Sequence, residues 1–227
     1  MTDAFDQYAD DYDTALARGV SLSGEDKDFF ARGRIAWMAR QLRREGEAPQ
    51  TILDFGCGTG TATPHLLALS PRCEVIGVDT SAKSIAVAQK THFTGRVRFM
   101  TTDAYRGTRV ELAYCNGVFH HIPPAERGDA LAYIRAALGK RGLLAFFENN
   151  PWNPGTRWVM RRIPFDRDAI LLTAGDARRM LRKAGFDIVI TDYLFVFPHI
   201  LRGLRPIEPH LSRFPFGAQY GILCRCL

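Results

Sequence analysis

A glycine-rich stretch at residues 51–60 has the composition of a nucleotide-binding turn. Apolar residues lead to Asp54, and glycine then recurs at alternate positions, Gly56, Gly58 and Gly60. This pattern is typical of a buried strand that ends in a tight turn before a helix. Glycine lets a ligand approach the main chain, and the N–H groups of a starting helix favour electron-rich ligand atoms. Many α/β proteins need such a turn merely to connect strand and helix, so the pattern by itself is a weak signal.

A second acidic residue strengthens the interpretation. The apolar run at residues 74–78 ends in Asp79, roughly 20 residues beyond the turn. In doubly wound folds a carboxylate at this spacing grips a ribose diol. The spacing therefore predicts an adenosine ligand. Asp79 could also cap the helix that opens at Ser81, a role compatible with ligand binding.

Two common nucleotide motifs do not fit the turn. A dinucleotide fingerprint needs glycine at the sixth position, where Thr61 stands, and a P-loop needs Gly-Lys-Ser/Thr, which is absent. The segment Leu53-Asp54-Phe55-Gly56-Cys57-Gly58-Thr59-Gly60 instead resembles the first motif of class I S-adenosylmethionine-dependent methyltransferases. The resemblance implies that S-adenosyl-L-methionine is the cofactor.

Further matches to this family imply a set of cofactor-binding residues. Asp54 would help to hold the methionine amino group, Asp79 the ribose hydroxyls, and Asp103-Ala104 the adenine ring. The full predicted set is Asp54, Gly56, Cys57, Gly58, Gly60, Asp79, Thr80, Asp103, Ala104, Asn116, Tyr8 and Tyr12. In the N-terminal segment, Phe5, Tyr8 and Tyr12 would line one side of a short helix. Related methyltransferases often fold a similar opening over the cofactor, so we expect Tyr8 and Tyr12 to shield it, although ordinary packing would give the same pattern.

The segment 116–122 resembles the part of the family that lies beneath the transferred methyl group. Methyl transfer from a sulfonium is a direct displacement, which gains most from alignment of acceptor, methyl and sulfur. A hydroxyl acceptor also benefits from a base, and histidine has a suitable pKa. His120 and His121 are therefore the candidate catalytic residues, with His120 preferred because His121 matches the commoner structural histidine of the family. Packing or capping of the following helix is the alternative role for either.

Aromatic and basic residues after position 150 are candidates for the acceptor site. Arg157, Arg161 and Arg162, at i, i+4 and i+5, would form a fork for carboxylate or phosphate, with Trp152 nearby. A small, acidic acceptor would suit such a fork. A solvated helix face is an equally good explanation of the three arginines.

The order of apolar runs predicts the fold that positions these residues. Strands are expected at 51–55, 74–79, 97–102, 112–116 and 143–148, separated by helices near 61–70, 81–91 and 124–138. This alternation indicates a doubly wound, Rossmann-like α/β fold, in which ligands lie outside the carboxyl ends of the strands. A helix at 175–184, strands at 188–197 and 219–226 and an irregular insertion at 198–216 follow. The resemblance implies a mostly parallel seven-stranded sheet with an antiparallel last strand.

The chain is expected to form a single methyltransferase domain, residues 1–227. Within it we expect a helical N-terminal lid (1–48), a cofactor-binding core (49–149), and acceptor-side inserts and closing strands (150–227). A longer helix at 25–45 would place Ile35, Met38 and Leu42 inward.

Composition restricts the class of protein without selecting a partner. The chain has 227 residues, 46% of them hydrophobic, which is ordinary for a globular domain. No apolar run reaches the roughly 18 residues of a membrane span, and the start carries no basic, apolar leader, so we expect a cytoplasmic protein. The five scattered cysteines lack paired spacing and predict buried thiols, with no disulfide scaffold and no metal. A net charge of +6 is compatible with nucleic acid, an anionic membrane or an acidic small molecule.

The sequence favours methylation of a small-molecule acceptor, on oxygen rather than nitrogen. An RNA or DNA methyltransferase is the nearest alternative, but the fourth strand ends in Asn116-Gly117-Val118-Phe119 rather than the Asn/Asp-Pro-Pro-aromatic segment of enzymes that methylate amino groups of nucleic acids. The sequence lacks the paired-glutamate loop of protein arginine methyltransferases and the third glycine of nicotinamide oxidoreductases. A non-catalytic S-adenosylmethionine-binding protein remains the other alternative, because binding motifs do not prove turnover.

Overall fold

A computed structural model describes residues 24–107, 109–163, 166 and 169–227. Its centre is a seven-stranded sheet in the order β3-β2-β1-β4-β5-β7-β6. The strands are β1 (Thr51–Phe55), β2 (Glu74–Asp79), β3 (Val97–Thr101), β4 (Val110–Asn116), β5 (Leu138–Asn149), β6 (Phe186–Leu194) and β7 (Gln219–Cys226). The first five pair in parallel, and β7 runs antiparallel to both β5 and β6. The predicted fold class, with its antiparallel last strand, is confirmed.

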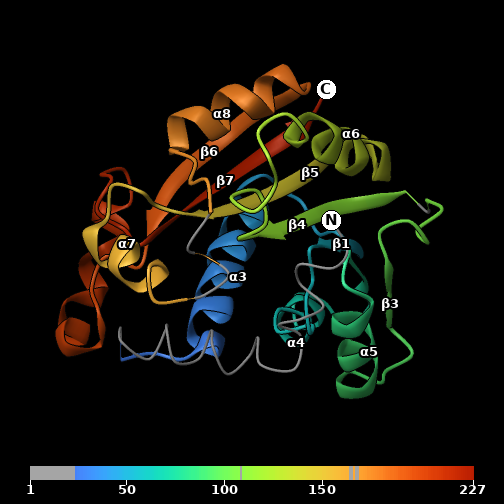
Figure 1. Ribbon diagram of the computed structural model, residues 1–227, viewed down its shortest axis with the longest axis horizontal. Coiled ribbons are helices and arrows are strands. Elements are labelled where there is room, and N and C mark those ends of the chain that lie inside the picture. Colours follow the sequence, from blue (N-terminus) through green and yellow to red (C-terminus); the bar gives the residue numbers. More distant parts are fainter. Residues whose placement is uncertain (1–23, 108, 164–165, 167–168) are drawn as a thin grey trace.

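Helices cover both faces of the sheet (Figure 1). On one face lie α3 (Lys27–Arg44), α4 (Thr63–Leu67) and α5 (Ala82–Thr91), and on the other lie α6 (Arg127–Ala137) and α8 (Ala174–Lys183). Strand residues alternate between the two cores: Leu53 packs toward α6 and α8, whereas Ile52 packs toward α3. Burial on both faces explains why the strands read as continuous apolar runs.

Helix α3 is fixed to the far end of the sheet by a buried hydrogen bond. Its predicted inward residues Ile35, Met38 and Leu42 are all buried. Between them, the Trp37 indole Nε1 donates to Asp192 Oδ2 of β6 at 2.8 Å, and its ring meets Phe147 edge-on. Because β6 and β7 close the sheet on this side, the bond ties the N-terminal helix to the C-terminal strands.

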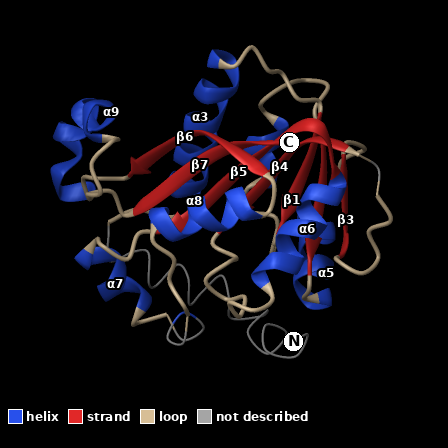
Figure 2. Ribbon diagram, turned by 90° about the horizontal axis from the view of Figure 1, so that it is seen from above, coloured by secondary structure: helices blue, strands red, loops and turns tan. Residues whose placement is uncertain are grey.

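Helices α7 (Pro154–Met160) and α9 (Glu208–Leu211) lie at one end of the sheet, whereas α8 runs along its face (Figure 2). After β5 come the short helix α7 and α8, and after β6 come the 3₁₀ helix η2 (His199–Ile207) and α9. The expected irregular insertion at 198–216 is therefore partly helical. The predicted helix near 61–70 is shorter than expected and begins with Pro64 in its first turn, where proline is well tolerated.

Two expectations are not tested by the described residues. The proposed lid residues Tyr8 and Tyr12 lie outside them, and the division of the chain into lid, core and inserts stays a prediction. Among the described residues no helix combines the length and the apolar character needed to cross a membrane.

Candidate active site

The polar residues predicted at the strand ends lie along one edge of the sheet. Strands β3, β2, β1 and β4 are parallel neighbours, so their carboxyl ends face the same way. Asp103, Asp79, Asp54 and Asn116 lie at or just beyond the ends of these strands, and we call this edge the rim. The observed strand order brings the ends of these four strands to one edge, as expected for a doubly wound sheet.

Asp79 and β2 hold the glycine turn in place. The main-chain N–H groups of Gly56 and Cys57 both donate to the Val78 carbonyl, at 2.8 and 3.0 Å. The Gly58 N–H donates to Asp79 Oδ2 at 2.8 Å. The cap of α5 is Ser81, whose side chain accepts from the Ser84 N–H. Asp79 Oδ1 also accepts the Ser81 N–H at 2.9 Å, so Asp79 supports the start of α5 as well as the turn.

The rim offers acceptor atoms and open space for a ligand. Gly58 has a φ of +53°, and a Cβ built there would meet no described atom within 4 Å. Among the described residues, Asp54 Oδ2 and Asn116 Oδ1 are buried and have no hydrogen-bond partner. Buried acceptors of this kind normally find a donor. An ammonium or amide donor from a bound ligand would satisfy them, and this is the chemistry that the methionine end of S-adenosylmethionine supplies.

The carboxyl of Asp54 has an unusual protonation equilibrium. Burial and the charge of Asp79 raise the pKa of Asp54 from 3.8 to about 7. The positive charge of Arg34 opposes this shift but does not outweigh it. A carboxyl with a strongly shifted pKa at a ligand-binding edge is characteristic of functional sites. A cationic ligand group beside Asp54 would favour its ionised form.

The other predicted cofactor residues lie on the same edge with different exposure. Thr80, Asp103 and Ala104 are exposed, as residues that touch a ligand from the solvent side must be. Cys57 is buried, and burial raises the pKa of its thiol well above the ordinary value. Gly60 has a φ of +83°, and a Cβ there would clash with His92.

His120 lies between two carboxylates. Its Nδ1 is 2.6 Å from Glu148 Oε2, and its Nε2 is 3.5 Å from Asp166 Oδ1. Burial opposes the charged form, but Glu148 and Asp166 outweigh it and raise the pKa of His120 to about 10. In this arrangement neither ring nitrogen of His120 is available to take a proton from an acceptor.

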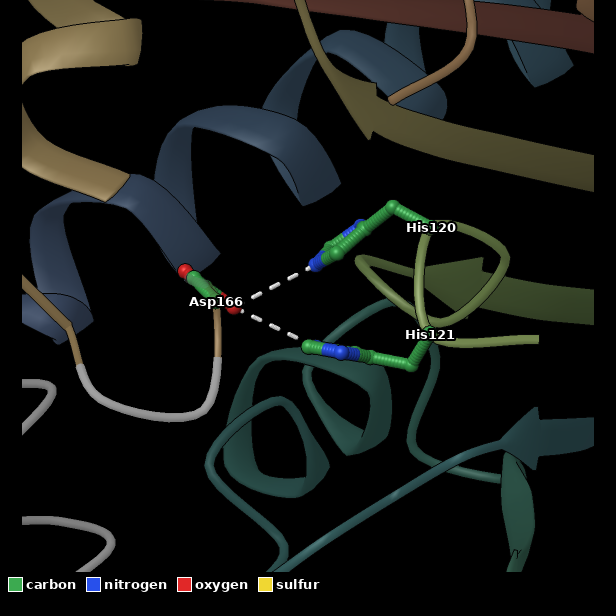
Figure 3. A group of neighbouring side chains, drawn as sticks. All are labelled: His120, His121 and Asp166. Carbon is green, nitrogen blue, oxygen red and sulfur yellow. Dashed lines mark ion pairs between the residues drawn. The ribbon is translucent and has the colours of Figure 1, made fainter. Parts of the chain in front are cut away.

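His121 shares Asp166 with its neighbour. Its Nε2 is 3.2 Å from Asp166 Oδ1, and its side chain is 15% exposed. Figure 3 shows both imidazole rings directed at the one carboxylate. The histidines follow β4, whereas Asp166 follows α7.

Both histidines and Asp166 line a cavity of about 390 Å³. Its wall begins at the rim with Asn116 and Gly117. The remainder is largely apolar and comes from α3, α7 and the segment after β6, including Phe29, Phe30, Trp158, Val159, Met160, Phe195 and Phe197. This is the size and character of a small-molecule site.

The cavity adjoins the glycine turn. A Cβ at Gly56 would meet Val118 Cγ2 at 2.3 Å, so Val118 lies directly against the turn. Val118 follows Gly117 of the cavity wall. A ligand on the rim and a molecule in the cavity would therefore be neighbours.

The structure places the predicted acceptor residues outside this cavity. Trp152, Arg157, Arg161 and Arg162 are exposed and are not part of its lining. The Arg162 guanidinium lies 3.7 Å from the centre of the Trp158 ring, so one arm of the expected fork packs on a residue of α7. Their part in acceptor binding stays a prediction.

Three residues of the site were not identified from the sequence. Glu148 holds His120 and also accepts the Phe119 N–H at 2.7 Å. Its position near the end of β5, beside β4, was a signal that could have found it. Buried Arg34, which donates to the Tyr114 hydroxyl at 3.0 Å, and Asp166 reach the site only through tertiary packing.

Comparison with known proteins supports the family resemblance. A family model described as a methyltransferase domain matches residues 53–144. Trans-aconitate 2-methyltransferase of Methylobacterium radiotolerans is 33% identical over 44% of this chain and 38% of its own length. Malonyl-[acyl-carrier protein] O-methyltransferase of Halalkalibacterium halodurans is 28% identical over 52% of this chain and 46% of its own length. The chain spans less than half the length of these two curated relatives.

Solved structures share the fold over nearly the whole chain. Magnesium protoporphyrin IX methyltransferase of Synechocystis, with bound S-adenosylhomocysteine, matches with a TM-score of 0.66 at 17% identity, over 100% of this chain and 98% of the other. Human N-acetylserotonin methyltransferase, in complex with S-adenosylmethionine, matches with a TM-score of 0.68 at 15% identity, over 99% and 59%. Residues 53–144 thus match a methyltransferase domain, within a chain that has the fold of the class I S-adenosylmethionine-dependent methyltransferases.

Proposed function

We propose that this protein transfers a methyl group from S-adenosylmethionine to an oxygen atom of a small molecule. The observation that supports this most directly is the junction of rim and cavity. Open space over Gly58 and the unpaired acceptors of Asp54 and Asn116 lie beside an apolar cavity of about 390 Å³.

Each rim residue would bind a different part of the cofactor. The buried atoms Asp54 Oδ2 and Asn116 Oδ1, which have no partner among the described residues, would accept from the amino-acid end. Asp79, which already fixes Gly58, would accept from the ribose hydroxyls, and exposed Asp103 and Ala104 would flank the adenine. When bound, S-adenosylmethionine supplies an electrophilic methyl group on a sulfonium. The chain would contribute alignment, by holding the acceptor in the cavity next to the turn.

The cavity supports a small-molecule acceptor over a nucleic acid. Its aromatic lining and limited volume suit a compact molecule with an apolar body. Lys27, Arg34 and Arg205 also line it, and these cations are compatible with an acidic acceptor. The two relatives named above carry the names of acidic acceptors, trans-aconitate and a malonyl group.

His120 and His121 stay candidate catalytic residues in this proposal. The contacts of His120 with Glu148 and Asp166 fit a positioning residue better than a base. His121 lines the cavity and is partly exposed, so it is the one that an acceptor would reach more easily.

Calorimetry with S-adenosylhomocysteine tests the cofactor half of the proposal. Asp79→Asn should weaken binding by about 10- to 100-fold, because hydrogen bonds to a charged group contribute about 1.5–3 kcal/mol. Asp187→Asn, an exposed change on β6, is the matched control and should leave affinity unchanged. If the parent protein neither binds nor is stabilised by S-adenosylhomocysteine, the proposal is wrong.

A methyl-labelled donor tests the acceptor half. The protein is incubated with a small-molecule fraction and, separately, with total RNA and DNA. Label in an oxygen-linked methyl of a small molecule is the expected result. Label confined to nucleic acid would favour the alternative methyltransferase class, and tight cofactor binding without label in any fraction would favour a non-catalytic binding protein.

A further inference from the structure

The group of side chains on the cavity wall has the composition of a metal site. His120 Nε2, His121 Nε2 and one carboxylate oxygen of Asp166 can all face one point, and such ligand atoms lie within 4.8 Å of one another. Two imidazoles and a carboxylate are a ligand set that Zn²⁺ and non-haem Fe²⁺ use in catalytic sites, which leave positions open for substrate. No cysteine takes part, so cysteine spacing gave no sign of this site.

The separations fit coordination to a common centre. His120 Nε2 and His121 Nε2 are 3.5 and 3.2 Å from Asp166 Oδ1. Two ligands bonded at 2.0–2.1 Å to a tetrahedral ion are about 3.3 Å apart. The carboxylate therefore already lies at the spacing that a shared ion would impose.

A second carboxylate orients His120 as metal sites require. Glu148 is 1% exposed, and its Oε1 is held by the Phe119 N–H while its Oε2 faces His120 Nδ1. With Nδ1 engaged in this way, Nε2 is the nitrogen left to face Asp166. Metal-binding histidines almost always have such a partner on the other ring nitrogen, and it fixes both tautomer and ring orientation.

The ligand residues are held by the main chain on both sides. The Ile170 N–H donates to the His120 carbonyl at 2.8 Å, and the Asp166 N–H donates to the Ile163 carbonyl at 3.1 Å. Asp166 is therefore fixed next to the histidines. All three ligands also face the cavity, so an ion bound there could contact a molecule in it.

We propose that His120, His121 and Asp166 bind one divalent transition-metal ion, of the Zn²⁺ or Fe²⁺ class, which binds the oxygen atom of the methyl acceptor. This inference rests on the proposed function and makes it more specific, since it defines the acceptor as a molecule with a metal-binding oxygen. A hydroxyl bound to the ion would lose its proton to solvent water more readily. The oxygen lone pair would then form the O–CH₃ bond while the CH₃–S bond breaks, and its electron pair stays on sulfur.

Cobalt titration tests the site without any need for turnover. The full-length protein is stripped with a chelator, dialysed and titrated with Co²⁺, whose visible absorption bands report coordination by nitrogen and oxygen. We expect one Co²⁺ per chain and displacement of Co²⁺ by Zn²⁺. His121→Ala and the isosteric Asp166→Asn should each weaken binding by at least about tenfold, and Glu148→Gln by about 10- to 100-fold.

A second histidine–aspartate pair provides the matched control. His65 Nε2 lies 2.7 Å from Asp28 Oδ1 on the surface, and the described residues provide no third ligand there. His65→Ala should leave the Co²⁺ spectrum and stoichiometry unchanged. Circular dichroism confirms that each variant is folded before it is titrated.

Two results would overturn the metal assignment. One is a parent protein that takes up no Co²⁺ in the micromolar range. The other is uptake that survives both His121→Ala and Asp166→Asn. Binding of S-adenosylhomocysteine by the metal-free protein separates this failure from failure of the proposed function. Equal methyl transfer with and without metal would refute the role of the metal and leave the proposed methyltransferase activity intact. Absence of cofactor binding would refute the methyltransferase activity, and the Co²⁺ titration would still decide the metal site.

Discussion

Substitution of Asp54 by asparagine tests the electrostatics of the rim. The pKa of this buried carboxyl is raised from 3.8 to about 7, chiefly by desolvation and by the charge of Asp79. The folded protein therefore holds a proton on Asp54 at pH values where the unfolded chain has lost it. Asp54 contributes stability that is fully present below pH 3.8 and is lost as the pH rises to about 7.

The size of the effect follows from the shift. Each pKa unit corresponds to about 1.4 kcal/mol, and between pH 5 and pH 8 the parent protein should lose roughly 3 kcal/mol through this one group. The asparagine side chain of the variant would not titrate. The free energy of unfolding of Asp54→Asn minus that of the parent should therefore increase by roughly 3 kcal/mol over the same range. Any constant cost of an unpaired asparagine amide shifts the whole curve and leaves this increase unchanged.

Urea unfolding of both proteins at several pH values measures the difference directly. Contributions from all other titrating groups cancel in the comparison unless Asp54 alters them. Parallel curves for the parent and Asp54→Asn would refute the reasoning, because they would mean that the carboxyl ionises at its ordinary pKa in the folded protein. A second measurement links the group to the cofactor: at pH 6, binding of a ligand with an ammonium group should release a proton from the parent and not from the variant. Calorimetry in two buffers of different ionisation enthalpy detects that proton.

Further substitutions separate structural from ligand-binding roles. Gly56→Ala should destabilise the fold by well over about 1 kcal/mol, because a positive φ costs about that much and the new methyl meets Val118 at 2.3 Å. Gly58→Ala should cost only about 1 kcal/mol in thermal unfolding, since φ is +53° but no described atom is near, while its methyl should sharply reduce affinity for S-adenosylhomocysteine. Equal stability loss in the two variants would contradict this contrast. Trp37→Phe should reduce the unfolding free energy by about 1.5–3 kcal/mol, because it leaves the buried Asp192 carboxylate without its 2.8 Å donor. A loss below about 0.5 kcal/mol in urea unfolding would show that this bond does not tie α3 to the sheet.

The parallel, doubly wound sheet and the rim were within reach of the sequence. Apolar runs with helices between them restrict the chain to parallel strands covered on both faces, and this topology puts successive strand ends on one edge. Asp54, Asp79 and Asn116 could be placed together for that reason alone. The glycine turn was equally local, because positive φ values and close approach are properties of single residues.

The acceptor side depended on the tertiary structure. Arg157, Arg161 and Arg162 form a plausible fork along the sequence, yet they lie on an exposed surface because the short helix α7 turns another side toward the cavity. Helical spacing says which residues share a face but not what that face meets. The sequence favoured His120 over His121 without any knowledge of their surroundings, since the partners of His120 come from β5 and from the segment after α7.

The sequence by itself thus determined the rim, because its parts are joined by short stretches of chain and by the regular pairing of strands. The tertiary structure alone decided the cavity and its histidine–carboxylate group, because Glu148 and Asp166 are distant from His120 in the sequence and contact it only in the folded protein. Contacts between distant parts of the chain depend on how buried surfaces pack, and no periodicity in the sequence records that packing.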